Sequence, residues 1–464
     1  MPSSLHSHGR GRRKSRSSED STGGIVSHGG LDGGEHPGRS RSSRESPGPA
    51  PSGVTRRAVT GALAATGLTA AGLTAWGGVR ARAAERGAPS EGVRLRLPAP
   101  TGPHRIGVTA LHLADRSRRD PWQAGIPVRE VMVTVFHPAR TVRGRSVAPQ
   151  MAREAAKVFR EFDTAVLHPE LPKSGVDWSA TRTHAYRGAP AQAVRRPVLL
   201  YSPAGGDPRT MGTGLAEELA SHGWVVVTVD HPGDAGEVAF PAATPHRGRV
   251  RRTDLRGNPR TDPGVFRTAI STRVADLRFV LDQLELLADG RNPDVPGRAL
   301  PEGLGRALDL GRVGVYGHSA GGTCAAQALY EDRRIAAAVN LEGFLDHPPE
   351  RPGEEGALFP VARYGVDRPV LLVGTDGFPQ RGELERSWSA MLAHGGPGTR
   401  RRQLAGATHG VFTDYAALAP QLEAAGLMSA GDRRTLVGAM SPRQSVPWVR
   451  HRVLSFFARH LPAP

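Results

Sequence analysis

The chain has 464 residues, a net charge of +17 and a single cysteine. One cysteine excludes an intramolecular disulfide, a cysteine-based zinc site and a two-thiol redox motif. The basic charge would suit nucleic acid, but the arginine cluster at residues 247–260 contains no aromatic residue that could stack on a base. We therefore expect a solvated loop there and no nucleic-acid partner, with transient attraction to anionic lipid head groups as the alternative.

The first part of the chain has the composition of a targeting region. Residues 1–57 are rich in Ser, Arg and Gly, so we expect them to be disordered. Arg56-Arg57 precede a charge-free stretch over residues 58–79, and Ala81-Arg82-Ala83 supplies the small residues of an A-x-A cleavage site. This arrangement resembles a twin-arginine export signal and predicts a secreted protein; an uncleaved signal that anchors the protein in a membrane is the alternative.

The expected division of the chain follows from these signals. It consists of a disordered basic segment (1–57), an export signal with its cleavage site (58–83), a linker (84–95) and one folded domain (96–464).

The folded domain begins with strand and helix patterns of different kinds. Two alternating runs, Val108–Ala114 and Val128–Phe136, predict an antiparallel β-hairpin at the edge of a sheet. Between residues 151 and 166, apolar side chains recur at helical spacing in a charged segment, which predicts an inserted amphipathic helix. Because periodicity shows only that one face is covered, this helix is either a packed decoration or a small lid over a binding pocket.

From residue 197 onward, short apolar runs alternate with helical patterns. The expected strands cover residues 197–202, 224–229, 310–316, 335–341, 369–373 and 402–405. A long amphipathic helix is expected over residues 266–288. The repeated β-α-β order indicates a mostly parallel, doubly wound sheet with helices on both faces. In such a sheet, functional loops lie at the carboxyl ends of the strands.

One of these loops carries the motif Gly317-His318-Ser319-Ala320-Gly321. The motif alone is weak evidence, because the chain contains 58 glycines. Its context is more specific, since an apolar strand precedes it and a helix of small residues follows it. A serine on a sharp strand-to-helix turn is the nucleophile elbow of an α/β-hydrolase fold. We therefore predict this fold, with Ser319 as the nucleophile.

A serine hydroxyl needs a base to take its proton, and the chain order in this fold is serine, acid, histidine. His409 alone among the later histidines follows the last expected strand in a glycine-flanked loop. The acid that would orient its imidazole is either Glu342 or Asp376, because each ends a strand. Position in the commonest α/β-hydrolases favours Asp376.

The negative charge that develops on the substrate oxygen needs backbone N–H donors. We expect one from Ala320, directly after the nucleophile and at the start of a helix. The second is expected from Gly205, in the loop after the strand at residues 197–202.

Several stretches outside the serine motif belong to one recognisable pattern. They are Leu97-Pro98-Ala99-Pro100-Thr101-Gly102-Pro103, Leu200-Tyr201-Ser202 with Arg209-Thr210, Leu219-Ala220-Ser221-His222-Gly223-Trp224, Val229-Asp230-His231, and Gly406-Ala407-Thr408-His409 with Phe412 and Asp414. Together with the serine motif, they resemble the platelet-activating-factor acetylhydrolase family of the plasma and bacterial type, over roughly residues 96–460.

The resemblance implies a serine-dependent ester hydrolase that needs no metal or other cofactor, similar to 1-alkyl-2-acetylglycerophosphocholine esterases. Such enzymes often act on short or oxidised acyl chains of phospholipids, and bacterial relatives include lipases and polyester hydrolases. It also implies that the acid is Glu342, where the family usually has aspartate. A second departure is Pro203-Ala204, where relatives carry His-Gly.

The sequence as a whole thus predicts an exported serine esterase or lipase that acts on a small-molecule or lipid ester through an acyl-enzyme intermediate. Two alternatives follow from the same residues. The protein could be a peptidase or amidase with the same triad, or a catalytically silent member that binds lipid.

Overall fold

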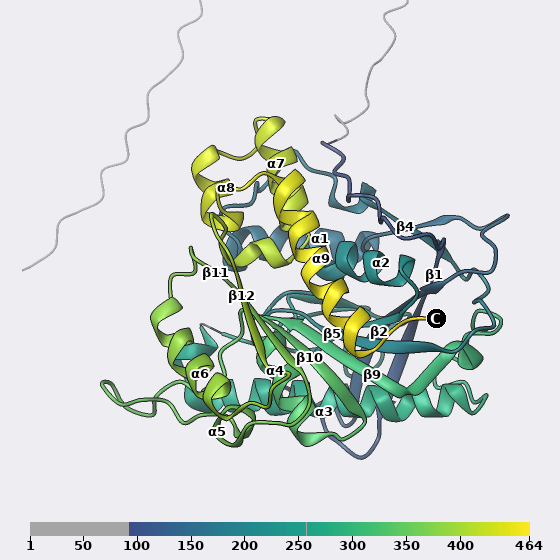
Figure 1. Cartoon of the computed structure of the whole chain (residues 1–464). Coiled ribbons are helices and arrows are strands. Elements are labelled where there is room, and N and C mark those ends of the chain that lie inside the picture. The colour runs from purple at the N-terminus through teal and green to yellow at the C-terminus, as the bar shows by residue number, and fades with distance from the viewer. Residues whose placement is uncertain (1–91, 257) are drawn as a thin grey trace, which may run out of the picture. The chain divides into compact units, whose positions relative to one another are not determined.

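The computed structural model describes residues 92–256 and 258–464 (Figure 1). The expected disordered segment and export signal lie outside these residues, as does most of the expected linker. In the described part of the chain, no helix is both long and apolar enough to cross a bilayer. Leu95 is buried and Val93 bridges to Val176, so the packed domain begins before residue 96.

A ten-stranded sheet forms the centre of the domain, in the order β12-β11-β10-β9-β5-β6-β2-β1-β4-β3. Its strands are β1 (Ile106–Asp115), β2 (Arg129–Pro138), β3 (Val147–Pro149), β4 (Arg182–Arg187), β5 (Arg196–Ser202), β6 (Val225–Asp230), β9 (Leu308–His318), β10 (Ile335–Leu341), β11 (Val370–Thr375) and β12 (Arg400–Leu404). The six neighbouring strands β12, β11, β10, β9, β5 and β6 all pair in parallel. This confirms the expected doubly wound α/β-hydrolase sheet.

The N-terminal hairpin is confirmed, but its expected place at the sheet edge is wrong. β1 and β2 pair antiparallel from Ile106↔Pro138 to Asp115↔Arg129, and β2 also pairs with β6. On its other side, β1 pairs in parallel with β4, and β3 continues the sheet beyond β4. β4 and β3 are short, and β4 ends in exposed arginines, which are features that protect a free sheet edge from further pairing.

Helices cover both faces of the sheet (Figure 1). They are α1 (Arg153–Phe162), α2 (Thr213–Ser221), α3 (Pro263–Ala288), α4 (Ala320–Glu331), α5 (Pro360–Tyr364), α6 (Arg381–His394), α7 (Tyr415–Ala424), α8 (Ala430–Val437) and α9 (Pro442–His460). α3, α4 and α6 pack in one hydrophobic cluster, while α2 and α9 pack in another. β5 contributes Val198 and Leu200 to the first cluster and Leu199 and Tyr201 to the second, as expected of a strand buried on both faces.

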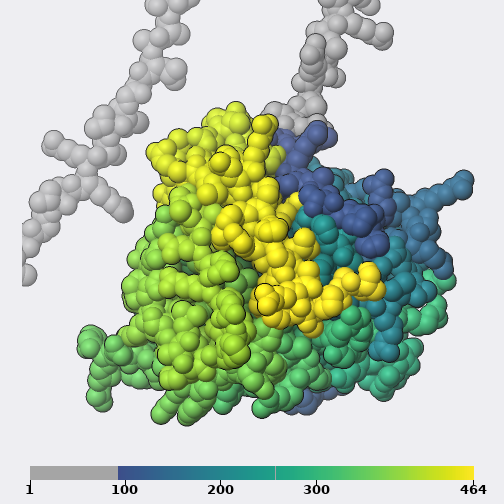
Figure 2. All heavy atoms as spheres, in the orientation of Figure 1, coloured from purple at the N-terminus to yellow at the C-terminus, as the bar shows by residue number. Residues whose placement is uncertain are grey.

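The C-terminal helix α9 lies against the first described residues. Figure 2 shows the yellow C-terminal segment next to the purple N-terminal segment on the molecular surface. Arg450 of α9 donates hydrogen bonds to the backbone oxygens of Ala99 and Pro98, at 2.8 and 3.0 Å. These contacts anchor the proline-rich entry segment to the domain.

The inserted helix forms, but it ends earlier than the periodicity predicts. α1 stops at Phe162 and continues as a π-helical turn, η1 (Asp163–Leu167). A π-turn has more residues per turn than an α-helix, so the apolar stripe loses its register and Val166 is 61% exposed. Phe159 and Met151 pack in a third hydrophobic cluster with residues of α7 and α8.

The arginine cluster differs from the expected solvated loop. β7 (Glu237–Ala239) and β8 (Val250–Arg252) form a small separate sheet in this region. Arg247 is buried and pairs with Glu130 at 2.5 Å, and Arg251 is buried and pairs with Asp120 at 2.6 Å. The carboxylates lie more than a hundred residues earlier in the chain, which is why the sequence pattern did not reveal the pairing.

Candidate active site

Ser319 lies on a strained turn between β9 and α4. Its backbone φ is +55°, a value that residues other than glycine seldom adopt. α4 begins at the next residue, Ala320. A Cβ on Gly317 would overlap the backbone of Gly321, and a Cβ on Gly321 would overlap the backbone oxygen of Ser202, so both positions require glycine. Ser319 itself is partly exposed, which is required of the nucleophile expected at this position.

His409 meets the carboxylate of Glu342. His409 opens the short 3-10 turn after β12, and its Nδ1 lies 2.9 Å from Oε2 of Glu342. The Glu342 side chain is fully buried, while that of His409 is 30% exposed. A carboxylate can only accept this bond, so Nδ1 carries the proton and Nε2 is left free to accept another.

Glu342 is fixed by the neighbouring strand. Its second oxygen, Oε1, accepts hydrogen bonds from the backbone N–H and, at 2.8 Å, from the hydroxyl of Thr375 at the end of β11. Its φ is +60°, so the backbone directly after β10 is strained like that of Ser319. Among residues 92–256 and 258–464, Ser319 and Glu342 are the two residues other than glycine with a positive φ, and both belong to this site.

Asp376 occupies a different position. Its side chain is exposed, and its two carboxylate oxygens accept the backbone N–H of Gly406 at 2.8 and 3.0 Å. This contact holds the start of the loop that leads to His409. The structure therefore joins His409 to Glu342 and joins Asp376 to the backbone of that loop.

Aromatic rings surround His409. Phe378 stacks on its imidazole with a centroid distance of 4.7 Å, and the ring of His318 lies 4.3 Å away. Phe344 packs against Phe378 at 5.7 Å. Burial, and secondarily the neighbouring His409, lower the pKa of His318 well below its usual value, so this ring stays neutral. Sequence reasoning missed His318 and the two phenylalanines, since only their position in the fold distinguishes them.

The loop after β5, Pro203–Gly206, passes beside the start of α4. We call it the oxyanion loop. Gly205 is exposed, and a Cβ on it would lie 3.7 Å from the Cβ of Ala320. Gly206 has a φ of +85° and donates its N–H to Asp234 at 3.0 Å. The two expected oxyanion donors, Gly205 and Ala320, are thus neighbours in space.

Arg273 of α3 holds the oxyanion loop through its guanidinium group. Its guanidinium donates to the backbone oxygens of Pro203 and Ala204 at 2.6 and 2.9 Å, and it pairs with Asp234 at 2.6 Å. The side chains of Arg273 and Asp234 are almost fully buried. A planar group that binds two carbonyls and a carboxylate together restricts the loop to one conformation.

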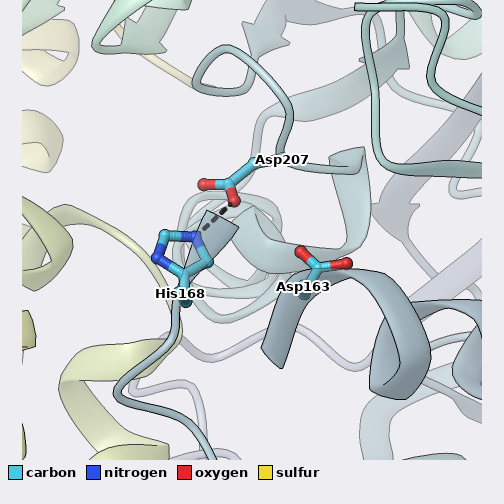
Figure 3. A group of neighbouring side chains, drawn as sticks. All are labelled: Asp163, His168 and Asp207. Atoms are coloured by element: carbon cyan, nitrogen blue, oxygen red, sulfur yellow. Dashed lines mark hydrogen bonds and ion pairs between the residues drawn. The ribbon is translucent and has the colours of Figure 1, made fainter. Parts of the chain in front are cut away.

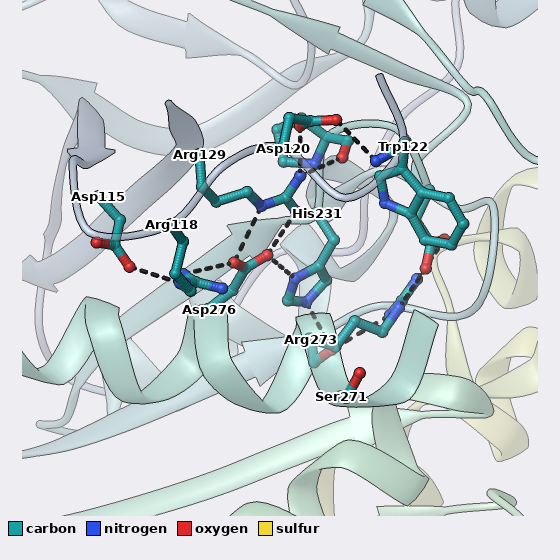
Figure 4. Close-up of polar contacts among 12 residues, drawn as sticks. Asp115, Arg118, Asp120, Trp122, Arg129, His231, Ser271, Arg273 and Asp276 are labelled. Carbon is teal, nitrogen blue, oxygen red and sulfur yellow. Dashed lines mark hydrogen bonds and ion pairs between the residues drawn. The ribbon is translucent and has the colours of Figure 1, made fainter. Parts of the chain in front are cut away.

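A second serine, histidine and aspartate meet in the interior. Ser202 Oγ lies 2.9 Å from Nε2 of His231, whose Nδ1 lies 3.0 Å from Asp276. All three side chains are inaccessible to solvent, and burial lowers the pKa of His231 to about 4. Asp276 also pairs with the buried Arg129 at 2.6 Å (Figure 4). No substrate can reach this group, so its role is to support the loop. Ser319, by contrast, is partly exposed.

The sheet, the elbow and the loops at its carboxyl edge define an α/β-hydrolase. The chain belongs to the family described as platelet-activating factor acetylhydrolase, isoform II, whose pattern matches residues 176–461. It is accordingly a carboxylic ester hydrolase.

Two individual proteins illustrate this relationship. A protein of the fungus Arthroderma benhamiae named "Probable 1-alkyl-2-acetylglycerophosphocholine esterase" is 26% identical over 385 residues, covering 78% of this chain and 87% of that protein. The solved structure of a ferulic acid esterase from Streptomyces cinnamoneus is 31% identical and superposes with a TM-score of 0.60, covering 80% of this chain and 94% of that one.

Proposed function

We propose that this protein is a serine esterase in which Ser319, His409 and Glu342 form the catalytic triad. The observation that carries the proposal is the 2.9 Å hydrogen bond between His409 Nδ1 and the buried Glu342. It leaves Nε2 of a partly exposed imidazole free to accept a proton, and this imidazole packs at 4.3 Å against the ring of His318, the residue directly before Ser319. This is the arrangement that a base requires when it takes a proton from a serine hydroxyl.

The proposed reaction has two halves. Ser319 Oγ attacks the ester carbonyl while His409 takes the hydroxyl proton, and the backbone N–H groups of Ala320 and Gly205 stabilise the oxyanion. His409 then gives the proton to the departing alkoxide, which leaves an acyl-enzyme. Water attacks the acyl group with His409 again as base, and the acid product is released from Ser319. Glu342 stabilises the imidazolium in both halves.

The use of glutamate in place of aspartate has a structural explanation. The side chain of glutamate is one methylene longer than that of aspartate. Oε1 of Glu342 is held by Thr375, so the longer side chain is not free to change its rotamer. The other oxygen is thereby presented to His409 at normal hydrogen-bond distance.

For the substrate we propose a short acyl ester, including that of a phospholipid, on the basis of family membership. A second candidate is an ester of an aromatic acid. Phe378 and Phe344 form an aromatic surface beside His409, and the structural relative from Streptomyces cinnamoneus is titled a ferulic acid esterase. The two are separated by comparing kcat/KM for nitrophenyl acetate, butyrate and octanoate, a short-chain phospholipid, and methyl ferulate.

A fluorophosphonate probe tests the serine mechanism directly. We expect the probe to label Ser319, as identified by peptide mapping, and to leave the buried Ser202 unmodified. Ser319→Ala should abolish labelling and lower kcat by about 10⁴-fold or more, with the folded state retained. Absence of labelling in the wild-type protein would favour a catalytically silent, lipid-binding member. Matched nitrophenyl ester and nitroanilide substrates separate an esterase from a peptidase or amidase.

We also propose export through the twin-arginine route, on the basis of Arg56-Arg57 and the charge-free stretch over residues 58–79. In a bacterial host that has this route, esterase activity should collect in the culture medium. The double variant Arg56→Lys/Arg57→Lys should remain in the cells. Equal secretion of both proteins would contradict this route, and activity that stays in the membrane pellet would indicate the anchored alternative.

A further inference from the structure

A second group of polar side chains lies beside the oxyanion loop. Asp163 opens the π-turn η1, His168 follows its end, and Asp207 comes directly after Gly206 (Figure 3). One carboxylate oxygen from each aspartate and one imidazole nitrogen of His168 all lie within 4.8 Å of one another. The mechanism proposed above uses none of these three side chains.

The π-turn contributes to this convergence. The backbone N–H of His168 donates to the carbonyl oxygen of Asp163 at 2.7 Å, a bond between residues five apart. In a regular α-helix, residues at this spacing point in different directions, and π-turns are frequent at functional sites. From the other side, Asp207 lies 3.0 Å from Nε2 of His168. The ring of Tyr415 packs edge-on against the imidazole at 4.7 Å and limits its rotation.

The environment of Asp163 indicates that a ligand binds here. Its side chain is fully buried, and apart from the neighbouring carboxyl group of Glu237, neither of its oxygens has a hydrogen-bond partner among residues 92–256 and 258–464. One of these oxygens belongs to the convergent set. A buried carboxylate without a partner is strongly unfavourable, and buried charges in proteins are paired or coordinate metals.

Glu237 adds another buried carboxyl group, within hydrogen-bond reach of Asp163 and without a further partner in the described part of the chain. A proton shared between Asp163 and Glu237 would satisfy one oxygen of each. The second oxygen of Asp163 would remain unpaired. A cation, by contrast, compensates the charge of the whole group.

We propose that Asp163, His168 and Asp207 bind a divalent cation and that Zn²⁺ fits this site best. Zn²⁺ takes imidazole nitrogen and carboxylate oxygen at about 2.0–2.2 Å, whereas Ca²⁺ prefers sets made only of oxygen. Small side-chain rotations bring three atoms that already lie within 4.8 Å onto one ion. His168 is partly exposed, which gives the ion a path of entry.

The bound ion would join the end of the inserted helix to the oxyanion loop. The two segments are already in contact, since a Cβ on Gly206 would lie 2.8 Å from the side chain of Leu167. The role of the ion is structural, and the attack by Ser319 does not pass through it. The family resemblance described above implies an esterase that needs no metal for catalysis, and a structural ion is compatible with that.

The test is calorimetric and uses the full chain, freed of metal with a chelator and dialysed. Titration with Zn²⁺ should show a site of micromolar or tighter Kd, and binding of Ca²⁺ should be weaker. Zn²⁺ at about a hundredfold excess over Kd should raise the Tm by about 5 °C. Asp163→Asn and His168→Gln should each weaken this binding at least tenfold and remove most of the Tm increase.

The controls separate this site from histidines elsewhere. His246→Gln changes an exposed histidine outside the group and should leave both the Kd and the Tm increase intact. Without metal, Asp163→Asn should be at least as stable as the wild type, because a neutral amide, which can donate a hydrogen bond to Glu237, replaces a buried carboxyl group. The proposal is overturned if the wild type does not bind Zn²⁺, if Asp163→Asn and His168→Gln bind it equally well, or if Ca²⁺ binds more tightly. Esterase activity does not enter these readouts.

Discussion

Glu342 and His409 are joined by a hydrogen bond of 2.9 Å although 67 residues separate them in the chain. Glu342 follows β10 and His409 follows β12, so a whole strand lies between them in the sheet. That strand, β11, ends in Thr375, which holds the other oxygen of Glu342. The carboxylate is therefore oriented by the same parallel sheet that positions the histidine.

This pairing predicts different effects for the two candidate acids. Glu342→Gln should lower kcat on a nitrophenyl ester by about 10³–10⁴-fold, because an amide can donate to Nδ1 and stabilises the wrong tautomer of His409. Asp376→Asn should change kcat much less, since Asp376 contacts the backbone of Gly406. Steady-state kinetics of both variants at equal folded concentration provide the comparison. A larger loss in Asp376→Asn would contradict our assignment of the acid.

Arg273 is expected to act as a positioning residue. The double variant Arg273→Met/Asp234→Asn removes the guanidinium without leaving its buried partner charged. We expect kcat to fall about 10–100-fold with little change in KM, because the oxyanion loop loses the two bonds that hold Pro203 and Ala204. The Tm of the variant, measured in parallel, shows whether it remains folded. Unchanged kcat in a folded variant would show that the loop keeps its conformation without Arg273.

Two adjacent glycines of the same loop should respond differently to alanine. Gly206→Ala should destabilise the protein by about 1–3 kcal/mol, because its φ is +85° and a Cβ would press on Leu167 at 2.8 Å. Gly205→Ala should cost much less, since its Cβ would make an ordinary contact of 3.7 Å with Ala320. Denaturant unfolding of both variants measures the difference. Equal losses would mean that the left-handed backbone at Gly206 is not required.

The buried His137 makes stability depend on pH. Burial lowers its pKa from 6.5 to about 4, so between these values the unfolded chain binds a proton that the folded chain does not. Its contribution to stability is thus present above pH 6.5 and declines as the pH falls toward 4, by roughly 3 kcal/mol in total.

His137→Phe removes this titration and keeps an aromatic ring at a fully buried position. Relative to the wild type, the variant should therefore gain roughly 3 kcal/mol between pH 7 and pH 4. Urea unfolding at three or four pH values measures the difference and cancels the titration of all other groups. A difference that does not change with pH would show that His137 titrates normally in the folded protein.

Several elements of the fold could be predicted because their signals are local. The strand at residues 335–341 agrees with β10. The helix expected over residues 266–288 lies within α3, which begins at Pro263 with Asp262 as its N-cap. The elbow at Ser319 is visible because a strand, a turn and a helix adjoin in the sequence. The inserted helix was predicted too long. The prediction used a constant number of residues per turn, and the π-turn that begins at Asp163 changes that number.

The sequence by itself determined the order of the N-terminal hairpin and the parallel strands that follow it, the serine turn and the candidate histidine, since side-chain periodicity and turn chemistry act over a few residues. Only the tertiary structure decided that Glu342, and not Asp376, meets His409, and that Arg273 lies under the oxyanion loop. It also decided that Asp163 and His168 converge on Asp207. These contacts depend on which strands are neighbours in the sheet and on the depth at which each charge is buried. Neither quantity is encoded in the spacing of residues along the chain.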